Sequence, residues 1–392
     1  MKLLFVQGGS RLKQDDKGYW YTDGNFNDDV WKRYLKLCEE LIVLLRREDK
    51  IYSEKEAKQK FNCFNNGYNI DIVSLLDVYS SSKSFLKQKE NDSIIEKNVI
   101  KCDAAVIRSV GNYYTNTVLK FCIKYHKPYL IEVTGFAWEG QWYHGLKGKI
   151  FALPRELKMR KSIKNASYVS YVTNKTLQKR YPSAGITLGC SDVELEELDN
   201  SVLINRLDKI VSHHGTFTLG TAGWLEQLKG QQTAIEALGE LKKRGNLNFK
   251  YQLLGLGSTN YLKSVAEKCG VSSQVFFLGG KTREEVLKWM DSVDVYIQPS
   301  FSEGLCRTIV EAISRACPTI CSNAGGNIEL IDERYIFKSG NYFQIANMLE
   351  KIDTKSLVEQ AKCNFRSAHY FDKILLNKRR EEFYRKFIAD VT

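Results

Sequence analysis

Short apolar runs alternate with longer amphipathic segments along the whole chain, and this alternation predicts its secondary structure. Brief runs rich in Val, Ile and Leu, bounded by Gly, Asp or Pro, are typical of buried strands. We expect strands at 2–6, 69–75, 104–107, 129–133, 218–222, 250–254, 275–277, 295–298 and 319–321. Helical periodicity lies at 29–46, 116–125, 230–244, 259–269, 283–290 and 305–315. Alternating strands and helices predict parallel sheets with helices on both faces.

The alternation breaks between residues 183 and 214, where acidic side chains cluster and the periodicity is poor. A chain of 392 residues is long enough for two domains, since domains average about 150 residues. We therefore predict an α/β protein of two doubly wound domains, 1–200 and 201–369, with a cleft between them. The helical pattern at 370–392 is expected to pack back on the first domain.

The segment 11–28 follows the first predicted strand and shows no regular period, so we expect a long loop there. Loops at the carboxyl ends of strands are where such folds bind ligands. The aromatic residues of this segment, with Trp20 among them, suit stacking on sugar rings. Packing of the same residues against their own domain is the more ordinary explanation.

Positive charge is concentrated in one part of the chain. The net charge is +12, and residues 101–180 contain fifteen lysines and arginines against four acidic residues. A solvated basic face explains this segment as well as attraction for phospholipid head groups, a diphosphate-linked substrate or nucleic acid does. No apolar stretch approaches the roughly 20 residues of a membrane helix, and the first ten residues do not resemble a signal peptide. We expect the protein in the cytoplasm, and peripheral attachment to the inner face of the plasma membrane is compatible with this location.

Ten cysteines are scattered through the chain without a CxxC pair or a histidine at zinc-finger spacing. Cys317 and Cys321 lie four residues apart, but two thiols without a second pair make a weak zinc site. Free thiols in a reducing compartment are therefore expected. No convincing Asp-x-Asp loop follows a strand, so we expect neither a metal ion nor another cofactor.

The segment from Pro299 to Glu311 contains the strongest candidate for a functional site. A strand ends, the chain turns, and a helix begins near Gly304, whose missing side chain lets a ligand approach the backbone. The first-turn amides of a helix carry partial positive charge and bind phosphates or hydroxyls. Glu303 and Glu311 could each accept hydrogen bonds from vicinal hydroxyls. In an isolated pair of this kind, the first glutamate more often interacts with the helix dipole and the second is an ordinary exposed charge. The neighbouring segments decide between this explanation and a binding site.

Those neighbours form an ordered series of motifs. They are Gly220-Thr221-Ala222-Gly223, Lys229-Gly230, Leu253-Leu254-Gly255-Leu256-Gly257, Phe276-Phe277-Leu278-Gly279, Asp294–Ser300, Cys317-Pro318-Thr319-Ile320 and Ala324–Glu329. In this order they resemble the donor-binding half of the family-4 retaining glycosyltransferases, enzymes of the GT-B fold. The resemblance covers about residues 215–335 closely and is faint over 1–135. It implies an acceptor-binding first domain and a donor-binding second domain.

The resemblance also implies roles for individual residues. Glu303 would lie close to the transferred sugar, and Lys229 would neutralise the donor diphosphate, which makes both candidate catalytic residues. Glu311 would hold the nucleotide ribose. The other residues that would bind the donor are Gly223, Gly255 and the backbone amides of Gly304, Leu305 and Cys306.

Other positions fit the pattern less closely. Gly8 and Gly9 would match an N-terminal glycine turn that faces the donor across the cleft. Arg307 could contact phosphate, although a surface helix arginine explains it as well. Many members have an arginine after the glycine of the first donor loop, whereas this chain has Trp224. No functional histidine of the first domain can be transferred, so Glu139 and His144 are candidate acceptor contacts only.

The function that the resemblance implies is transfer of a sugar from a UDP- or GDP-linked donor, with retention of configuration. The acceptor would be a glycan or a lipid-diphosphate-linked oligosaccharide in capsule or O-antigen biosynthesis, and the anionic membrane surface is a candidate partner. Another nucleotide-sugar enzyme of the same fold, an epimerase or a phosphorylase-like enzyme, is the alternative. A basic nucleic-acid-binding protein is a distant one, since no nucleic-acid motif occurs in the sequence.

Overall fold

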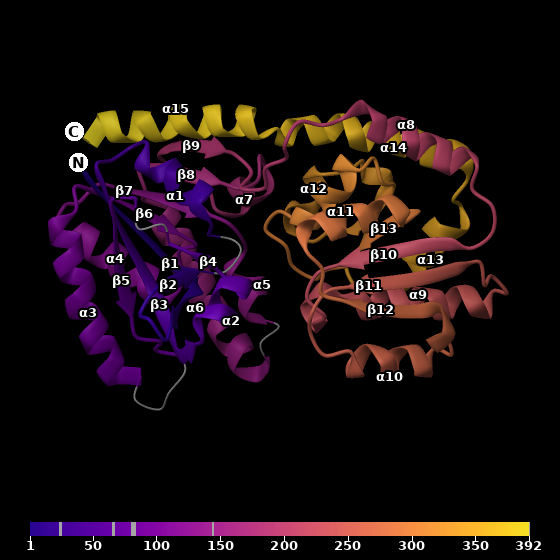
Figure 1. Cartoon of the computed structure of the whole chain (residues 1–392), viewed down its shortest axis with the longest axis horizontal. Helices are drawn as coiled ribbons and strands as arrows, with labels where there is room; N and C mark the ends of the chain where they lie inside the picture. The colour runs from indigo at the N-terminus through magenta and orange to yellow at the C-terminus, as the bar shows by residue number, and fades with distance from the viewer. Residues whose placement is uncertain (23–25, 65–66, 80–83, 143–144, 392) are drawn as a thin grey trace.

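The computed structural model describes residues 1–22, 26–64, 67–79, 84–142 and 145–391. Figure 1 shows two α/β domains side by side, joined along one edge by helices near the end of the chain. Each domain is built on a largely parallel sheet. Within the described residues, no helix combines the length and the apolar character needed to cross a bilayer.

The first domain contains a sheet whose parallel strands run in the order β5-β3-β1-β6-β7-β8-β9. β2 extends it as an antiparallel partner of the far end of β1, and β4 pairs antiparallel with β2. The order of the strands reverses between β1 and β6, and ligands bind at such switch points. The strands are β1 (Lys2–Asp15), β2 (Trp20–Thr22), β3 (Glu40–Tyr52), β4 (Asn62–Cys63), β5 (Ile70–Leu75), β6 (Ala104–Arg108), β7 (Tyr129–Val133), β8 (Tyr168–Tyr171) and β9 (Ile186–Gly189).

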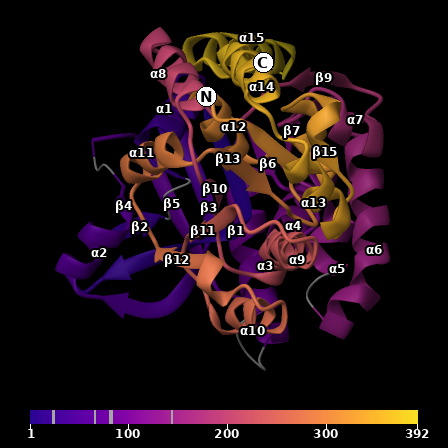
Figure 2. The same ribbon diagram turned by 90° about the vertical axis from the view of Figure 1, so that its right-hand side faces the viewer.

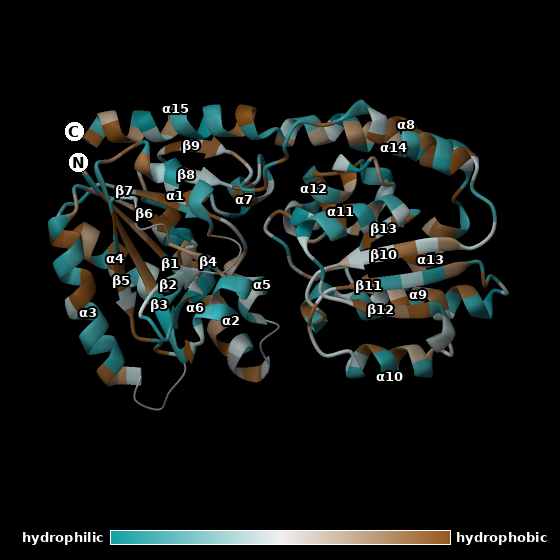
Figure 3. Ribbon diagram, viewed as in Figure 1, coloured by the Kyte–Doolittle hydropathy of each residue, from teal (hydrophilic) through white to brown (hydrophobic). Residues whose placement is uncertain are grey.

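Helices cover both faces of this sheet because successive side chains of a strand point to opposite faces. In β1, Leu4 and Val6 join one apolar core with α3, α4 and α6, whereas Leu3 and Phe5 join the other with α1 and α15. Figure 3 shows the apolar strands of the first sheet in brown and alternating brown and teal along α15. The helices are α1 (Asp28–Leu35), α2 (Glu54–Lys60), α3 (Ser84–Lys101), α4 (Tyr113–Lys124), α5 (Ala137–Trp142), α6 (Gly145–Lys164), α7 (Thr176–Arg180) and α15 (Lys373–Val391).

The prediction of one helix over 29–46 is wrong. Helix α1 ends at Leu35, and strand β3 begins at Glu40. Residues 41–45 are all buried, because β3 pairs with β1 on one side and β5 on the other under helices on both faces. A continuous apolar run of this kind has no period that separates a doubly buried strand from a helix.

The prediction of a long loop over 11–28 is also wrong. β1 continues to Asp15, and the chain returns as β2 in an antiparallel pair. Leu12 and Tyr21 are fully buried. The carboxylate of Asp15 accepts hydrogen bonds from the backbone of Lys17 and Tyr19 and so organises the turn between the strands.

The second domain contains a parallel sheet in the order β12-β11-β10-β13-β14-β15, which reverses between β10 and β13. The strands and helices predicted for this half all occur, with ends within about two residues of those expected. The strands are β10 (Phe217–Ala222), β11 (Phe249–Leu254), β12 (Val275–Gly279), β13 (Val295–Gln298), β14 (Thr319–Ser322) and β15 (Ile336–Phe337). The helices are α8 (Asn200–Val211), α9 (Gln231–Lys243), α10 (Asn260–Lys268), α11 (Arg283–Ser292), α12 (Arg307–Ser314), α13 (Tyr342–Glu350) and α14 (Thr354–Ala368).

The chain passes between the domains twice, and the two passages lie side by side. Leu195 on the outward passage donates its N–H to Phe371, and Lys373 on the return donates to Leu195, at 2.8 and 2.9 Å. Beyond this point α15 crosses to the first domain, where Tyr384 and Phe387 are buried in its apolar core. Both views show α8, α14 and α15 along the same edge of the molecule (Figures 1 and 2).

Candidate active site

A cavity of about 420 Å³ lies between the domains, and we call it the cleft cavity. The first domain contributes Gln7 and Ser10 from the middle of β1 and residues at the carboxyl ends of β6 and β7, and the second contributes residues at or after the ends of β10 and β13. Both switch points therefore face this cavity, where the fold places ligand sites. Its wall includes Gln7, Ser10, Arg33, Arg108, Ser109, Thr134, Asp192, Gly223, Trp224, Lys229, Gln298, Glu303, Leu305, Cys306, Arg307 and Thr308.

Glu303 and Lys229 form an ion pair in the wall of the cleft cavity. Lys229 Nζ lies 2.8 Å from Glu303 Oε1, and the same oxygen accepts a hydrogen bond from Ser300 Oγ at 2.7 Å. The Glu303 side chain is 10% exposed and that of Lys229 is 24% exposed. The structure thus brings together the two candidate catalytic residues, which are far apart in the sequence.

The electrostatics of this pair keep the lysine charged. Burial opposes the charged form of Lys229, but the carboxylate of Glu303 outweighs it, so the pKa of Lys229 is raised above its ordinary value. Gly230 fixes the position of the lysine, because it has a φ of +68° and a Cβ there would lie 2.0 Å from the Pro299 carbonyl oxygen. A charged lysine in a partly buried cleft attracts an anion strongly.

Gly304 is the point at which the two domains touch through their backbones. A Cβ on Gly304 would lie 1.9 Å from the carbonyl oxygen of Thr134. Leu305 and Cys306 follow in the cavity wall, and Cys306 is the N-cap of α12. Burial raises the pKa of the Cys306 thiol to about 12, so the thiol stays protonated at neutral pH.

Arg307 and Glu311 lie one turn apart on α12. Arg307 lines the cleft cavity, whereas the Glu311 carboxylate lies deeper, with its side chain 6% exposed and Oε1 3.6 Å from Arg283 Nε. Burial raises the pKa of Glu311 above that of an ordinary glutamate. Glu311 is therefore close to the cavity without forming part of its wall.

Sequence reasoning missed a second charged group in this wall. Arg108, the last residue of β6, contacts Glu132 through Nη1 and Asp192 through Nη2, both at 2.6 Å. Burial would raise the pKa of Asp192, but the charge of Arg108 outweighs it and lowers that pKa. The signal that could have found Arg108 is its place at the carboxyl end of a strand next to the switch point.

The remaining glycines support the site from outside the cleft cavity. Gly8 packs against Asn112, since a Cβ there would lie 2.2 Å from Asn112 Oδ1. Gly8 and Gly9 line a neighbouring cavity of about 790 Å³, which we call the arginine pocket for the Arg11, Arg46 and Arg155 in its wall. Gly255 lies behind Gly223, whose carbonyl oxygen would be 1.8 Å from a Cβ on Gly255. Gly255 thus seats the turn that lines the cleft cavity.

Of the candidate acceptor residues, Trp20 and Glu139 can be placed, and neither lines the cleft cavity or the arginine pocket. Trp20 is half-buried against the apolar core of the first domain and lines neither cavity. Glu139 in α5 has Oε1 3.9 Å from Arg180 Nη2, and its other oxygen is buried without a hydrogen-bond partner among the described residues. His144 lies outside the described residues. Glu139 itself does not line the arginine pocket, although its neighbour Gly140 does.

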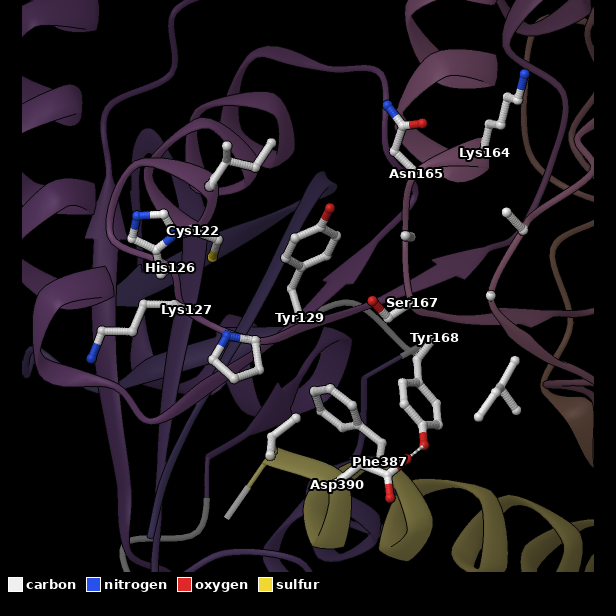
Figure 4. A pocket seen from close by; sticks show the side chains of 17 residues that line it. Cys122, His126, Lys127, Tyr129, Lys164, Asn165, Ser167, Tyr168, Phe387 and Asp390 are labelled. Carbon is white, nitrogen blue, oxygen red and sulfur yellow. Dashed lines mark hydrogen bonds between the residues drawn. The ribbon is translucent and has the colours of Figure 1, made fainter.

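A larger cavity, about 1050 Å³, lies at the opposite edge of the first sheet. Figure 4 shows Tyr129, Tyr168 and Phe387 in its wall, with Tyr168 bonded to Asp390 of α15. Tyr129 and Tyr168 are the first residues of β7 and β8, so this hollow is at the amino ends of the strands. The rule for open α/β sheets favours the smaller cleft cavity as the ligand site.

Comparison with known proteins identifies the family. Residues 206–364 match the family described as Glycosyl transferases group 1. The chain is 31% identical over 355 residues to Protein CapJ of Staphylococcus aureus, which covers 90% of this chain and 86% of CapJ. The chain belongs to the glycosyl transferases group 1 family. As a member of this family it is a glycosyltransferase, as the motifs between Gly220 and Glu329 predicted.

One further sequence relative and one solved structure resemble this glycosyltransferase. The capsular polysaccharide biosynthesis glycosyltransferase CapM of Staphylococcus aureus is 24% identical over 207 residues, which is 50% of this chain and 52% of CapM. The crystal structure of HepE from Anabaena in complex with UDP matches with a TM-score of 0.66 and 16% identity, over 98% of this chain and 100% of that chain. The likeness confirms the predicted GT-B fold of two Rossmann-like domains with a cleft between them.

Proposed function

We propose that this glycosyltransferase takes a sugar from a nucleoside diphosphate sugar bound in the cleft cavity and retains its anomeric configuration. The observation that carries the proposal is the ion pair of Lys229 and Glu303 beside the start of α12. Proteins similar to this chain support it, since HepE was crystallised with UDP and CapM is a capsular polysaccharide enzyme. A UDP-linked donor and a role in capsular polysaccharide synthesis are therefore part of the proposal.

The chemistry requires stabilisation of a diphosphate leaving group. Lys229 and Arg307 would supply positive charge, and the free amides at the start of α12 would supply hydrogen bonds, which together suffice without a metal ion. Glu303 would contact the transferred sugar, and Glu311 would hold the ribose hydroxyls. Activity lost to EDTA and recovered only with Mn²⁺ or Mg²⁺ would contradict the metal-free mechanism.

A thermal-shift panel of nucleoside diphosphates tests the donor site. A nucleotide present at 100 times its dissociation constant stabilises the fold by about 2.7 kcal/mol, which is readily measured. We expect UDP to raise the melting temperature of the protein and the Lys229→Gln variant to lose most of that increase. Absence of a shift with every nucleoside diphosphate would overturn the proposed function.

Glu303→Gln separates binding from transfer. The substitution keeps the size of the side chain and removes the charge that would act on the sugar, so we expect turnover to fall by about 100-fold or more while the UDP-induced shift persists. Glu284→Gln is the matched control, because Glu284 is an exposed acid of α11 with a side chain 80% exposed. Equal activity of the two variants would exclude a role of Glu303 in transfer.

A lipid-diphosphate-linked acceptor at an anionic membrane surface completes the proposal, and helix α6 supports it. Leu146, Ile150, Leu153 and Leu157 recur at helical spacing and are between 52% and 81% exposed, so they form an apolar stripe. Exposed cations of the same helix flank the stripe, and Lys149 is one of them. Apolar residues flanked by lysines are what an anionic membrane interface binds.

Vesicle co-sedimentation tests this attachment. We expect the protein to bind vesicles that contain anionic lipid at low salt and to dissociate as salt screens the attraction. Replacing Ile150 and Leu157 by serine should weaken binding, whereas Ile204→Ser on α8, a residue 58% exposed on the other domain, should not. Failure of the unaltered protein to bind at low salt would exclude this surface.

A further inference from the structure

The arginine pocket opens beside the cleft cavity at the carboxyl edge of the first sheet. The two cavities share Gln7, Ser109 and Thr134 in their walls, so a ligand in one is adjacent to a ligand in the other. The arginine pocket belongs to the first domain alone, since every residue of its wall lies between Gln7 and Met159. It is therefore placed to hold a second substrate next to the proposed donor.

Three arginines from separate parts of the chain meet in this wall. Arg11 belongs to β1, Arg46 to β3 and Arg155 to α6, and the residues that line the described cavity include no aspartate or glutamate. The carboxylate behind them is Asp77, which contacts Arg11 Nε at 3.2 Å and Arg46 Nη1 at 3.3 Å. Arg11 and Arg46 thus share the carboxylate of Asp77, and Arg155 adds a third positive charge to the same wall.

Arg155 has no acidic partner within the described part of the chain. Its burial lowers its pKa, with only a small opposing effect from Tyr79. A guanidinium group remains charged even when it is partly buried, so this position costs free energy in the absence of an anion. A bound anion would offset that cost.

Arg46 is held in place and keeps an unused donor. Its Nη2 donates to the Gly9 carbonyl oxygen at 3.0 Å, and its guanidinium group lies over the ring of Tyr79 at 5.4 Å. Its Nε is buried without a hydrogen-bond partner among the described residues. This buried nitrogen lies out of reach of the pocket, so Arg46 contributes to the wall through the positive charge of a fixed guanidinium group.

We propose that the arginine pocket binds a phosphate or diphosphate group of the acceptor substrate. Arginine forks match the paired oxygens of phosphate, and a doubly charged oxyanion matches three guanidinium groups set against the single charge of Asp77. A sugar carboxylate, with one negative charge, would leave the balance incomplete. The assignment to the acceptor rests on the proposed function, whereas binding of the anion does not.

Calorimetric titration with inorganic pyrophosphate, in the presence of UDP to fill the cleft cavity, tests this site. We expect the intact protein to bind pyrophosphate and Arg155→Gln to bind it about tenfold more weakly, since a hydrogen bond to a charged group contributes about 1.5–3 kcal/mol. Lys158→Gln is the matched control, because it removes one positive charge from an exposed position of the same helix. This control should bind pyrophosphate as the intact protein does.

A second variant protects the test against misfolding. If Arg155→Gln lowers the melting temperature, Arg11→Gln replaces it, because Arg11 is 44% exposed and its loss leaves the contact between Asp77 and Arg46 in place. Absence of pyrophosphate binding, equal binding by the arginine variants, or equally tight binding of glucuronate would overturn the proposal. Titration with UDP alone tests the proposed function separately. A negative result with pyrophosphate therefore leaves the UDP result valid, and a negative result with UDP leaves the pyrophosphate result valid.

Discussion

The two glutamates of the α12 segment differ in their surroundings, although the sequence presents them as a pair. Glu303 faces Lys229 in the cavity wall, whereas Glu311 is buried one turn beyond Arg307. Their spacing could be read from the chain. Their different partners could not, because Arg283 reaches Glu311 only through the packing of α11 against α12, which the local sequence does not contain.

The burial of Glu311 predicts a pH dependence of nucleotide binding. Because its pKa is raised above the ordinary value of 4.5, Glu311 takes up a proton earlier than an ordinary glutamate as the solution is acidified. The ionised form is the better acceptor for ribose hydroxyls, so we expect affinity for UDP to fall as the pH drops towards that raised pKa.

Calorimetry from about pH 8 to pH 5 measures this effect, a range that also includes titration of the phosphate itself. Glu311→Gln provides the correction, since any pH dependence that remains in the variant belongs to other groups. The raised pKa of Lys229 keeps that lysine charged throughout the range. Identical curves for the two proteins would show that Glu311 does not contact the nucleotide.

At the scale of elements, the second domain was the more predictable half. Strands β10 to β13 end at glycines or at a proline–serine turn, which mark the boundaries in the sequence, and all the strands predicted for this domain occur. The errors at 11–28 and 29–46 arose where tertiary pairing decides the conformation. β3 is recognisable as a strand only once β1 and β5 are known to lie on either side of it.

The residues of the candidate site also fall into those that the local sequence predicts and those that only the tertiary fold brings together. Lys229, Glu303 and Arg307 follow strands of one domain and could be assigned from motifs, and the structure brings them to one cavity. Arg108 and Asp192 lie 84 residues apart and meet through the folding of the first domain and the passage that leaves it. The arginine pocket is of this second kind, because its three arginines come from β1, β3 and α6.

The close contact between Gly304, just before α12, and the backbone of Thr134 predicts that one added methyl group lowers transfer activity. In Gly304→Ala the added Cβ would lie 1.9 Å from the Thr134 carbonyl oxygen, so the backbones of the two domains must separate. We expect transfer activity to fall by about tenfold or more, because misplacement of reacting groups by about 1 Å is costly.

Steady-state kinetics measures this loss, and small-angle scattering measures the separation of the domains. Ser302→Ala serves as the control, because it alters the same loop without adding an atom at the contact. Full activity of Gly304→Ala would show that this backbone contact is not required for transfer.

At the scale of the molecule, α15 follows the second domain in the chain but forms part of the core of the first domain. Phe387 is 1% exposed, and its ring lies 5.3 Å from that of Tyr168 on β8. Tyr384 reaches the buried carboxylate of Glu132, which also contacts Arg108 at the cleft. The last helix thus supports the sheet that carries half of the site.

Phe387→Ala should therefore destabilise the first domain by about 3–5 kcal/mol, the usual cost of removing a buried aromatic ring. Denaturant unfolding measures the free energy of unfolding of that domain. Phe85→Ala on α3 is the matched control, because Phe85 is 77% exposed, and its effect should stay within about 0.5 kcal/mol. Equal effects of the two substitutions would contradict a structural role for α15.

The return of α15 has a consequence for the order in which the protein is made. The first domain leaves the ribosome before the second, but the residues that complete its core, Tyr384 and Phe387, are synthesised after the second domain. Translation adds about 5–20 residues per second, so the nascent first domain waits about ten seconds or more with an uncovered apolar face. The second domain, whose core is drawn from about residue 193 onward, is complete before that face is covered. The part of the protein that is made first is therefore the part that is finished last.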